Sequence, residues 1–161
     1  MVKAIPTDEY FSIVREQLSV QGKAFVRVTG NSMQPLLYHL RDGAVIVPPS
    51  KIRVGDIVLY DRQNGRFALH RVISKGKTSF KMAGDNQYYI DKNLNYDQIV
   101  GVVSEIERKG KRISCNSFGL RLYSFWVIVI TGPRLFFHKV AAKIKRILFR
   151  SGGKAKKGDQ Q

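Results

Sequence analysis

Short runs of β-forming residues, separated by turn residues, fill the middle of this chain. The runs cover residues 24–28, 44–47, 56–60, 66–74, 79–82, 99–106 and 112–115. Asn64 and Gly65 stand between two of them and form a dipeptide typical of tight β-hairpins. Many short strands at this spacing favour one sheet that curls on itself. We therefore predict a mainly β fold, built as a folded β-sheet or partial barrel.

The two flanks of this β region have helical patterns. Residues 7–22 have amphipathic spacing, with Thr7 able to cap the helix and Gly22 following it. Residues 120–130 are apolar and aromatic, residues 131–133 (Thr-Gly-Pro) predict a break, and residues 134–150 have the spacing of a basic amphipathic helix. We thus divide the chain into an N-terminal helix (1–23), a β domain (24–117), an apolar then basic segment (118–150) and a disordered basic tail (151–161).

The charge balance points to an anionic partner. The 161 residues carry 28 Lys and Arg against 12 Asp and Glu, a net charge of +16, and every charged side chain between residues 109 and 157 is basic. Because Trp126 and many aliphatic residues lie among these charges, residues 120–150 favour an anionic membrane surface, and nucleic acid is not expected. Packing of this segment on the β domain is the alternative.

The remaining features of composition limit the class of protein. The N-terminus lacks the apolar core of a cleavable signal peptide, and no run reaches the roughly 18 apolar residues of a membrane span. Membrane association is therefore predicted to be peripheral or monotopic. Cys115 is the only cysteine, which excludes an internal disulfide and suggests a structural thiol. We expect no cofactor and no metal, because no cluster has metal-ligand spacing.

A candidate nucleophile follows the first β run. Ser32 lies in the segment Gly30-Asn31-Ser32-Met33-Gln34-Pro35, directly after residues 24–28. A turn at the end of a strand can hold a serine hydroxyl at a fixed and exposed position, as nucleophilic catalysis requires. An ordinary polar turn before a proline explains the same residues, and this alternative stays open on the segment alone.

A serine nucleophile needs a base to accept its proton, and histidine is the side chain suited to this near neutral pH. His70 is the best of three candidates when it is taken together with the Ser32 turn and residues 84–86 (Gly-Asp-Asn), whereas a structural histidine within a strand is the alternative for His70 alone. His39 follows Ser32 too closely to face it easily, and His138 lies within the basic helix. A third group should orient the imidazole, and two aspartates, Asp85 and Asp91, compete for this role.

Four segments occur in a characteristic order: residues 30–35, residues 54–58 (Val-Gly-Asp-Ile-Val), residues 70–72 (His-Arg-Val) and residues 84–86 (Gly-Asp-Asn). Together they resemble the S24/S26-type serine peptidases, which include type I signal peptidases and the self-cleaving SOS repressors. The histidine before Arg-Val is similar to the archaeal, endoplasmic-reticulum and spore-former subgroup of signal peptidases. The lysine base of the other subgroups therefore does not carry over to this chain.

The resemblance implies roles for individual residues. Asp91 would orient His70, whereas Asp85 would pair with Arg71 as part of the scaffold. Gly30 and Asn31 stand where signal peptidases usually have Ser-Gly, so the side-chain hydroxyl two residues before Ser32 is absent and the Ser32 backbone N–H is the implied oxyanion donor. The candidate residues are Ser32, His70, Asp91 and Asp85 for catalysis, Asn31, Met33 and Pro35 for substrate or oxyanion contact, and Arg71 with Asp85 as a structural pair.

The leading hypothesis is a signal-peptidase-like serine endopeptidase that cleaves a peptide or precursor protein, with small residues beside the cleaved bond. A self-cleaving, repressor-like peptidase is a weaker alternative. A DNA-binding repressor is not expected, because the 23 residues before the first strand cannot hold a helix-turn-helix domain. The other alternative is a non-catalytic basic β module that binds a membrane surface or nucleic acid.

Overall fold

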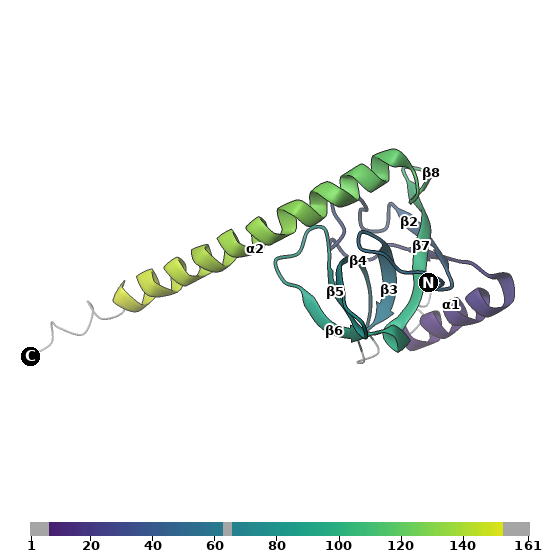
Figure 1. The fold of residues 1–161 in the computed structure, drawn as a ribbon, viewed down its shortest axis with the longest axis horizontal. Helices are drawn as coiled ribbons and strands as arrows, with labels where there is room; N and C mark the ends of the chain where they lie inside the picture. The colour runs from purple at the N-terminus through teal and green to yellow at the C-terminus, as the bar shows by residue number, and fades with distance from the viewer. Residues whose placement is uncertain (1–6, 63–65, 153–161) are drawn as a thin grey trace, which may run out of the picture.

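The computed structural model describes residues 7–62 and 66–152. In this part of the chain, strands form one antiparallel sheet flanked by an N-terminal and a C-terminal helix (Figure 1). The elements are α1 (Thr7–Gln21), β1 (Ala24–Arg27), β2 (Gly43–Val47), β3 (Ile57–Asp61), β4 (Phe67–Lys75), β5 (Ser79–Ala83), β6 (Asp91–Asn95), a 3-10 turn (Tyr96–Gln98), β7 (Ile99–Arg108), β8 (Lys111–Ser114) and α2 (Phe118–Gly152). The predicted mainly β fold class is confirmed.

The sheet has the strand order β1-β2-β7-β3-β4-β5-β6, and β8 pairs with β7. The predicted strands agree with the observed ones to within two residues at each end. Residues 64 and 65 of the predicted hairpin turn lie outside the described residues, but the flanking strands β3 and β4 do pair in antiparallel register. The sequence analysis missed β6, because Asp-Lys-Asn-Leu-Asn is poor in strand formers and buries only Leu94.

Two apolar clusters hold the sheet together. One lies between α1, β1, β2 and β7, where Val14 and Leu18 of α1 are buried. It also takes in Met33, Leu36 and Leu37 from the loop after β1. The other lies between β3, β4, β5 and β6. Because three core side chains anchor the loop after β1, Ser32 is attached to a tightly packed part of the molecule.

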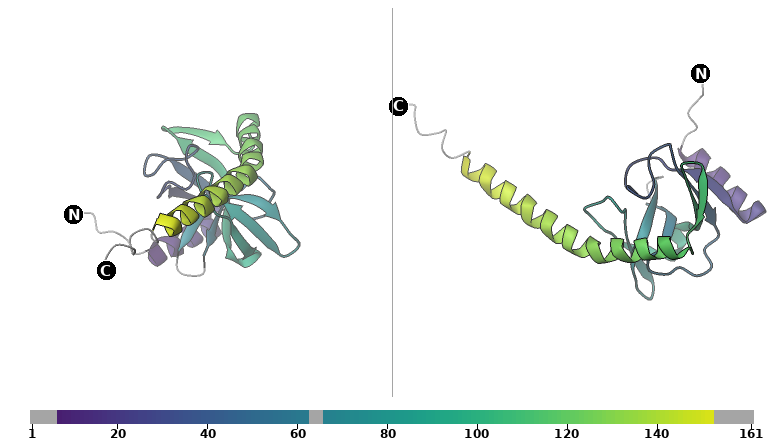
Figure 2. Two further views of the ribbon diagram at one scale, coloured as in Figure 1. Left: turned by 90° about the vertical axis from the view of Figure 1, so that its left-hand side faces the viewer. Right: turned by 90° about the horizontal axis from the view of Figure 1, so that it is seen from above.

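The helix α2 is continuous from Phe118 to Gly152, so the predicted break at residues 131–133 is wrong. Pro133 removes one backbone donor, yet the helix continues on either side of it. In the turn before Pro133, the Thr131 hydroxyl donates to the Val127 carbonyl oxygen at 2.6 Å. The first half of α2 lies along the sheet, and the second half extends beyond it (Figures 1 and 2). Of the predicted tail, residues 153–161 lie outside the described residues.

The expectation that no stretch could span a bilayer is also wrong by length and composition. Residues 118–144 form a helical stretch long and apolar enough to cross a membrane, with at most two charged side chains in an 18-residue window. A count of consecutive apolar residues misses it because isolated basic residues interrupt the run. The same helix contacts the β domain along one face, as the site described below shows.

Candidate active site

The loop that follows β1 holds Ser32 half-buried at its surface. Gly30 has a φ of +94°, which favours glycine, and the loop then closes on itself through a bond from the Leu37 N–H to the Met33 carbonyl oxygen at 2.9 Å. Met33 is buried beneath the loop, whereas Asn31 and Pro35 are exposed. The backbone of this segment is therefore fixed from below, and the Ser32 side chain remains accessible.

A second loop, residues 84–87, clamps the Ser32 backbone. The Asn86 N–H donates to the Ser32 carbonyl oxygen at 2.8 Å, and the Asn86 side-chain amide donates to the Asn31 carbonyl oxygen at 3.3 Å. A Cβ at Gly84 would lie 2.5 Å from the Ser32 carbonyl oxygen. The Gly-Asp-Asn motif thus has a physical reason that the sequence alone did not reveal: glycine permits the close approach, and asparagine makes the bonds.

His70 lies on β4, where its backbone pairs with Val58 of β3, and its side chain is almost fully buried. Ser32 and His70 line the same cavity of about 440 Å³, together with residues of α1, β1 and β4. Within residues 7–62 and 66–152, the structure records no hydrogen bond between the two side chains. Catalytic hydrogen bonds are often long in the absence of substrate and tighten when it binds.

The two competing aspartates have different partners. Asp91, at the start of β6, lies with its Oδ2 atom 3.1 Å from the His70 Nδ1 atom. Asp85 instead accepts two bonds from Arg71, at 2.8 and 2.7 Å, and both side chains are almost fully buried. The geometry therefore brings Asp91 to the imidazole and Asp85 to the guanidinium.

Two further side chains surround Asp91, and sequence reasoning did not identify either. The Tyr60 hydroxyl donates to Asp91 Oδ2 at 2.5 Å, and Arg62 donates to the same oxygen at 2.7 Å. Partial burial raises the pKa of Asp91, but hydrogen bonds from His70, Tyr60 and Arg62 outweigh it and hold that pKa well below the usual value. Asp91 is therefore a carboxylate at any pH near neutrality.

Both other histidines have different surroundings. The Gly30 N–H donates to His39 Nδ1 at 2.8 Å, so His39 bonds the loop that holds Ser32 and is not among the residues that line the cavity in the described ranges. His138, on α2, stacks on Tyr88 with ring centroids 4.4 Å apart. Of the three histidines, His70 alone is among the residues that line the cavity with Ser32 in the described part of the chain.

The helix α2 supports the site through the buried ion pair. Ser124 accepts a bond from Arg71 at 2.5 Å, and the Tyr123 hydroxyl donates to Asp85 at 3.1 Å. Further along the helix, Arg134 donates to the carbonyl oxygens of Asp85 and Gln87. The loop that clamps Ser32 is thus held from its other side by a helix that no motif connects with it.

The remaining predicted residues have simple placements. Met33 lines the cavity, whereas Asn31 and Pro35 are not among its lining residues in the described ranges. Burial raises the pKa of the Cys115 thiol to about 11, so it stays protonated and unreactive near neutral pH. Among the described residues, no three His, Cys, Asp or Glu side chains come together in a way that could hold a metal ion.

Comparison with known proteins places the chain in a family. The family model described as Peptidase S24-like matches residues 2–104, which is more than half of the chain and includes Ser32, His70, Asp85 and Asp91. No curated protein matches the chain. The match supports a serine-type peptidase or a self-cleaving, repressor-like function. The chain belongs to the S24-like peptidase family.

Proposed function

We propose that this protein is a serine endopeptidase of the signal-peptidase-like type that uses a histidine base. The observation that carries the proposal is the cavity shared by Ser32 and His70, with Asp91 bonded to the far side of the imidazole. A hydroxyl nucleophile, a neutral nitrogen base and a carboxylate that orients the base are the three groups that acyl transfer to serine requires. A non-catalytic module has no need of this combination.

The steps follow from these positions. Ser32 Oγ attacks the scissile carbonyl carbon while His70 Nε2 takes its proton, and the Ser32 N–H stabilises the oxyanion that forms. The imidazolium then gives the proton to the leaving amine, which leaves an acyl-enzyme. Water attacks this ester with His70 again acting as the base, and the second product departs.

A peptide substrate has a place to bind beside the nucleophile. Among the described strands, β1 is terminal in the sheet order and pairs with β2 alone, so its other edge can accept a further strand next to Ser32. The cavity is lined by residues 26–29 on this side and by residues 67–70 of β4 on the other. An extended peptide added along β1 would therefore pass its backbone across Ser32. Phe11 of α1 stacks on Phe67, and both side chains line the cavity.

The test is a fluorophosphonate probe, which reacts only with an activated serine. We expect labelling of the wild type and none of Ser32→Ala or His70→Ala, because the probe needs both the nucleophile and its base. Ser19→Ala is the matched control, because this serine only bonds its own helix α1. Equal labelling of wild type and Ser32→Ala would remove the proposal, and loss of an N-terminal fragment that depends on Ser32 would identify self-cleavage.

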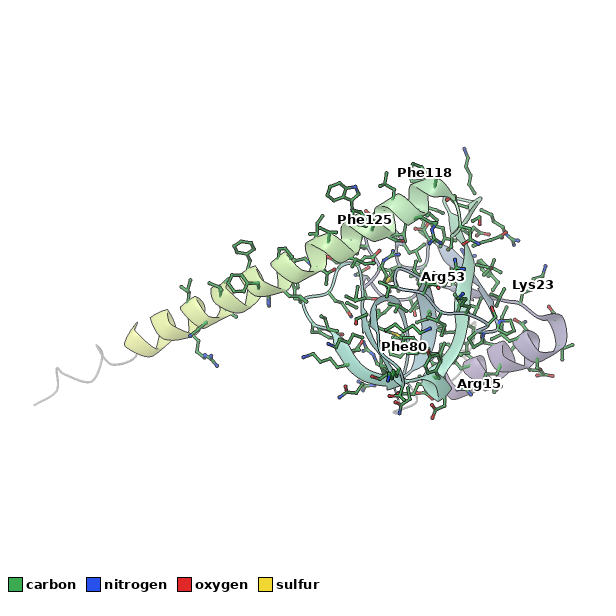
Figure 3. All side chains as sticks on the ribbon, in the orientation of Figure 1. Arg15, Lys23, Arg53, Phe80, Phe118 and Phe125 are labelled. Carbon is green, nitrogen blue, oxygen red and sulfur yellow. The ribbon has the colours of Figure 1, made fainter. Side chains whose placement is uncertain are left out.

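We further propose that α2 attaches the enzyme to an anionic membrane surface. The side of α2 away from the β domain carries exposed apolar residues, of which Figure 3 labels Phe118 and Phe125: Phe118, Leu122, Phe125, Trp126, Val129, Ile130, Phe136, Phe137, Val140 and Ile144. The opposite side is bonded to the domain through Tyr123, Ser124 and Arg134. A helix held in this way can lie in the interface, whereas crossing the bilayer would require these bonds to break.

Flotation with vesicles tests this attachment. Trp126→Glu with Phe125→Glu should lower binding to vesicles that contain phosphatidylserine by more than about tenfold, because charges would enter the apolar layer. Binding by the wild type should weaken on neutral vesicles, because the basic residues contribute about 1 kcal/mol each at an anionic surface. Val20→Glu, at an exposed apolar position of α1, is the control. Resistance of the wild type to extraction at high pH would favour a span over surface attachment.

A further inference from the structure

The closest side-chain partner of His70 Nδ1 is the hydroxyl of Tyr60, at 2.8 Å. Tyr60 is fully buried on β3, where the register pairs Val58 with His70 and Tyr60 with Ala68. Tyr60 and His70 are therefore diagonal neighbours on one face of the sheet, at a separation that long side chains bridge. Asp91 lies slightly further from Nδ1, at 3.1 Å.

Counting donors fixes the position of the protons in this cluster. Tyr60 has one proton to donate, and its short bond of 2.5 Å to the charged Asp91 Oδ2 uses it. Burial and the neighbouring Asp91 both raise the pKa of Tyr60, so this proton stays on the hydroxyl. The Tyr60 oxygen can then only accept from His70, which requires that Nδ1 carries the imidazole proton. His70 Nε2 is left with a free lone pair, as a general base needs.

Arg62 completes the cluster on its outer side. Its Nη2 atom donates to Asp91 Oδ2 at 2.7 Å, and its Nε atom lies 3.4 Å from the Tyr60 oxygen. Among the described residues, the polar and charged groups bonded to the Asp91 carboxylate are thus Tyr60, Arg62 and His70. The guanidinium keeps Asp91 ionised, but it also cancels part of the attraction between Asp91 and an imidazolium.

We propose that Tyr60 is a positioning residue for the His70 base: its hydroxyl donates a hydrogen bond to Asp91 and accepts one from the His70 Nδ1–H, while Arg62 moderates the charge of Asp91. This inference rests on the proposed function, because it assigns a role in the same reaction. A buried tyrosine that only fills the core would make the same packing contacts. Such a tyrosine would not affect how the rate of labelling at Ser32 depends on pH.

The experiment measures the rate of fluorophosphonate labelling of the full chain as a function of pH. Tyr60→Phe should slow labelling about tenfold, the cost of one lost hydrogen bond to a charged cluster. Arg62→Gln should move the acid limb of the profile to higher pH by roughly one unit, because uncompensated Asp91 holds the imidazolium more strongly. Arg62→Lys keeps the charge and should restore the limb to the wild-type position.

Matched controls separate this role from general damage. Tyr96→Phe removes a hydroxyl in the 3-10 turn, where the Tyr96 ring packs on Phe80; Phe80 pairs with Lys75 at the end of β4 far from His70. Arg66→Gln removes an exposed charge from the same hairpin as Arg62. Both should leave the profile unchanged. Profiles of Tyr60→Phe and Arg62→Gln that superimpose on the wild type would overturn the inference, and Arg62→Gln alone decides it if Tyr60→Phe does not fold.

A second measurement does not depend on activity. Long-range ¹⁵N–¹H spectra of the wild type should show His70 protonated on Nδ1 and not on Nε2. A proton on Nε2 would contradict the inference whatever the enzyme does. If the wild type shows the Nδ1 proton but no probe labels Ser32, the proposed function fails and the hydrogen-bond assignment remains.

Discussion

Replacing Asp91 with asparagine should lower the labelling and hydrolysis rates by roughly 10⁴ while the protein stays folded. The asparagine side chain would keep the shape of the aspartate but lose the charge that stabilises the imidazolium. Its amide nitrogen could also donate to Nδ1 and force the proton of His70 onto Nε2, where it would block proton transfer from Ser32. Circular dichroism and the thermal midpoint measure the fold, and fluorophosphonate labelling measures the site.

The fold should tolerate this change because Asp91 lies on an edge strand with its side chain 22% exposed. Asp97→Asn, in the exposed 3-10 turn that follows β6, is the matched control and should keep wild-type rates. A rate for Asp91→Asn within about tenfold of the wild type would mean that the carboxylate does not orient the base. The triad would then have to be abandoned in favour of a Ser32–His70 pair.

The β framework was predictable because local signals coincide with it. Residues 24–28 alternate between buried and exposed positions, and Gly22 ends α1 with a φ of +68°, as its position after the helix suggests. β6 was not predictable, because its residues are mostly polar and it forms a strand through its antiparallel pairing with β5. Asp91 therefore lay in a strand that the sequence did not indicate.

Part of the candidate site could likewise be predicted from the sequence, and part could not. Spacing and residue type identify Ser32 and His70, but the choice between Asp85 and Asp91 depends on which side chain each one meets across the sheet. Tyr60 and Arg62 reach Asp91 through the pairing of β3 with β4, of β4 with β5 and of β5 with β6. No periodicity within a single segment contains that information.

The largest contribution missed by sequence reasoning comes from α2. This helix begins after the residues that the family model matches, yet it supplies bonds to both members of the Arg71–Asp85 pair. Its basic and aromatic composition favoured a contact surface, with packing on the β domain as the alternative, but it did not indicate which residues of the domain the helix would bond. In the structure, Arg134 of this helix bonds the loop of residues 84–87, and that loop in turn bonds the Ser32 carbonyl oxygen.

Replacing Asp85 with asparagine should give the opposite result to the change at Asp91: a loss of about 3–5 kcal/mol of unfolding free energy. Arg71 and Asp85 have side chains that are 1% and 0% exposed, so the neutral amide would leave a buried guanidinium without its counter-charge. The Tyr123 hydroxyl would lose its charged acceptor in the same step. Urea unfolding followed by circular dichroism measures the change in unfolding free energy, because the sheet and both helices contribute to that signal.

The double variant Arg71→Met with Asp85→Leu tests whether the uncompensated charge of Arg71 causes the loss of stability in Asp85→Asn. It removes both charges together, so it should be markedly more stable than Asp85→Asn if an uncompensated charge is the cause. Any part of Asp85→Asn that remains folded should still be labelled at Ser32, because His70 and Asp91 are untouched. A variant with an unchanged urea midpoint and no labelling would exchange the roles of the two aspartates, with Asp85 acting in catalysis and Asp91 in the scaffold.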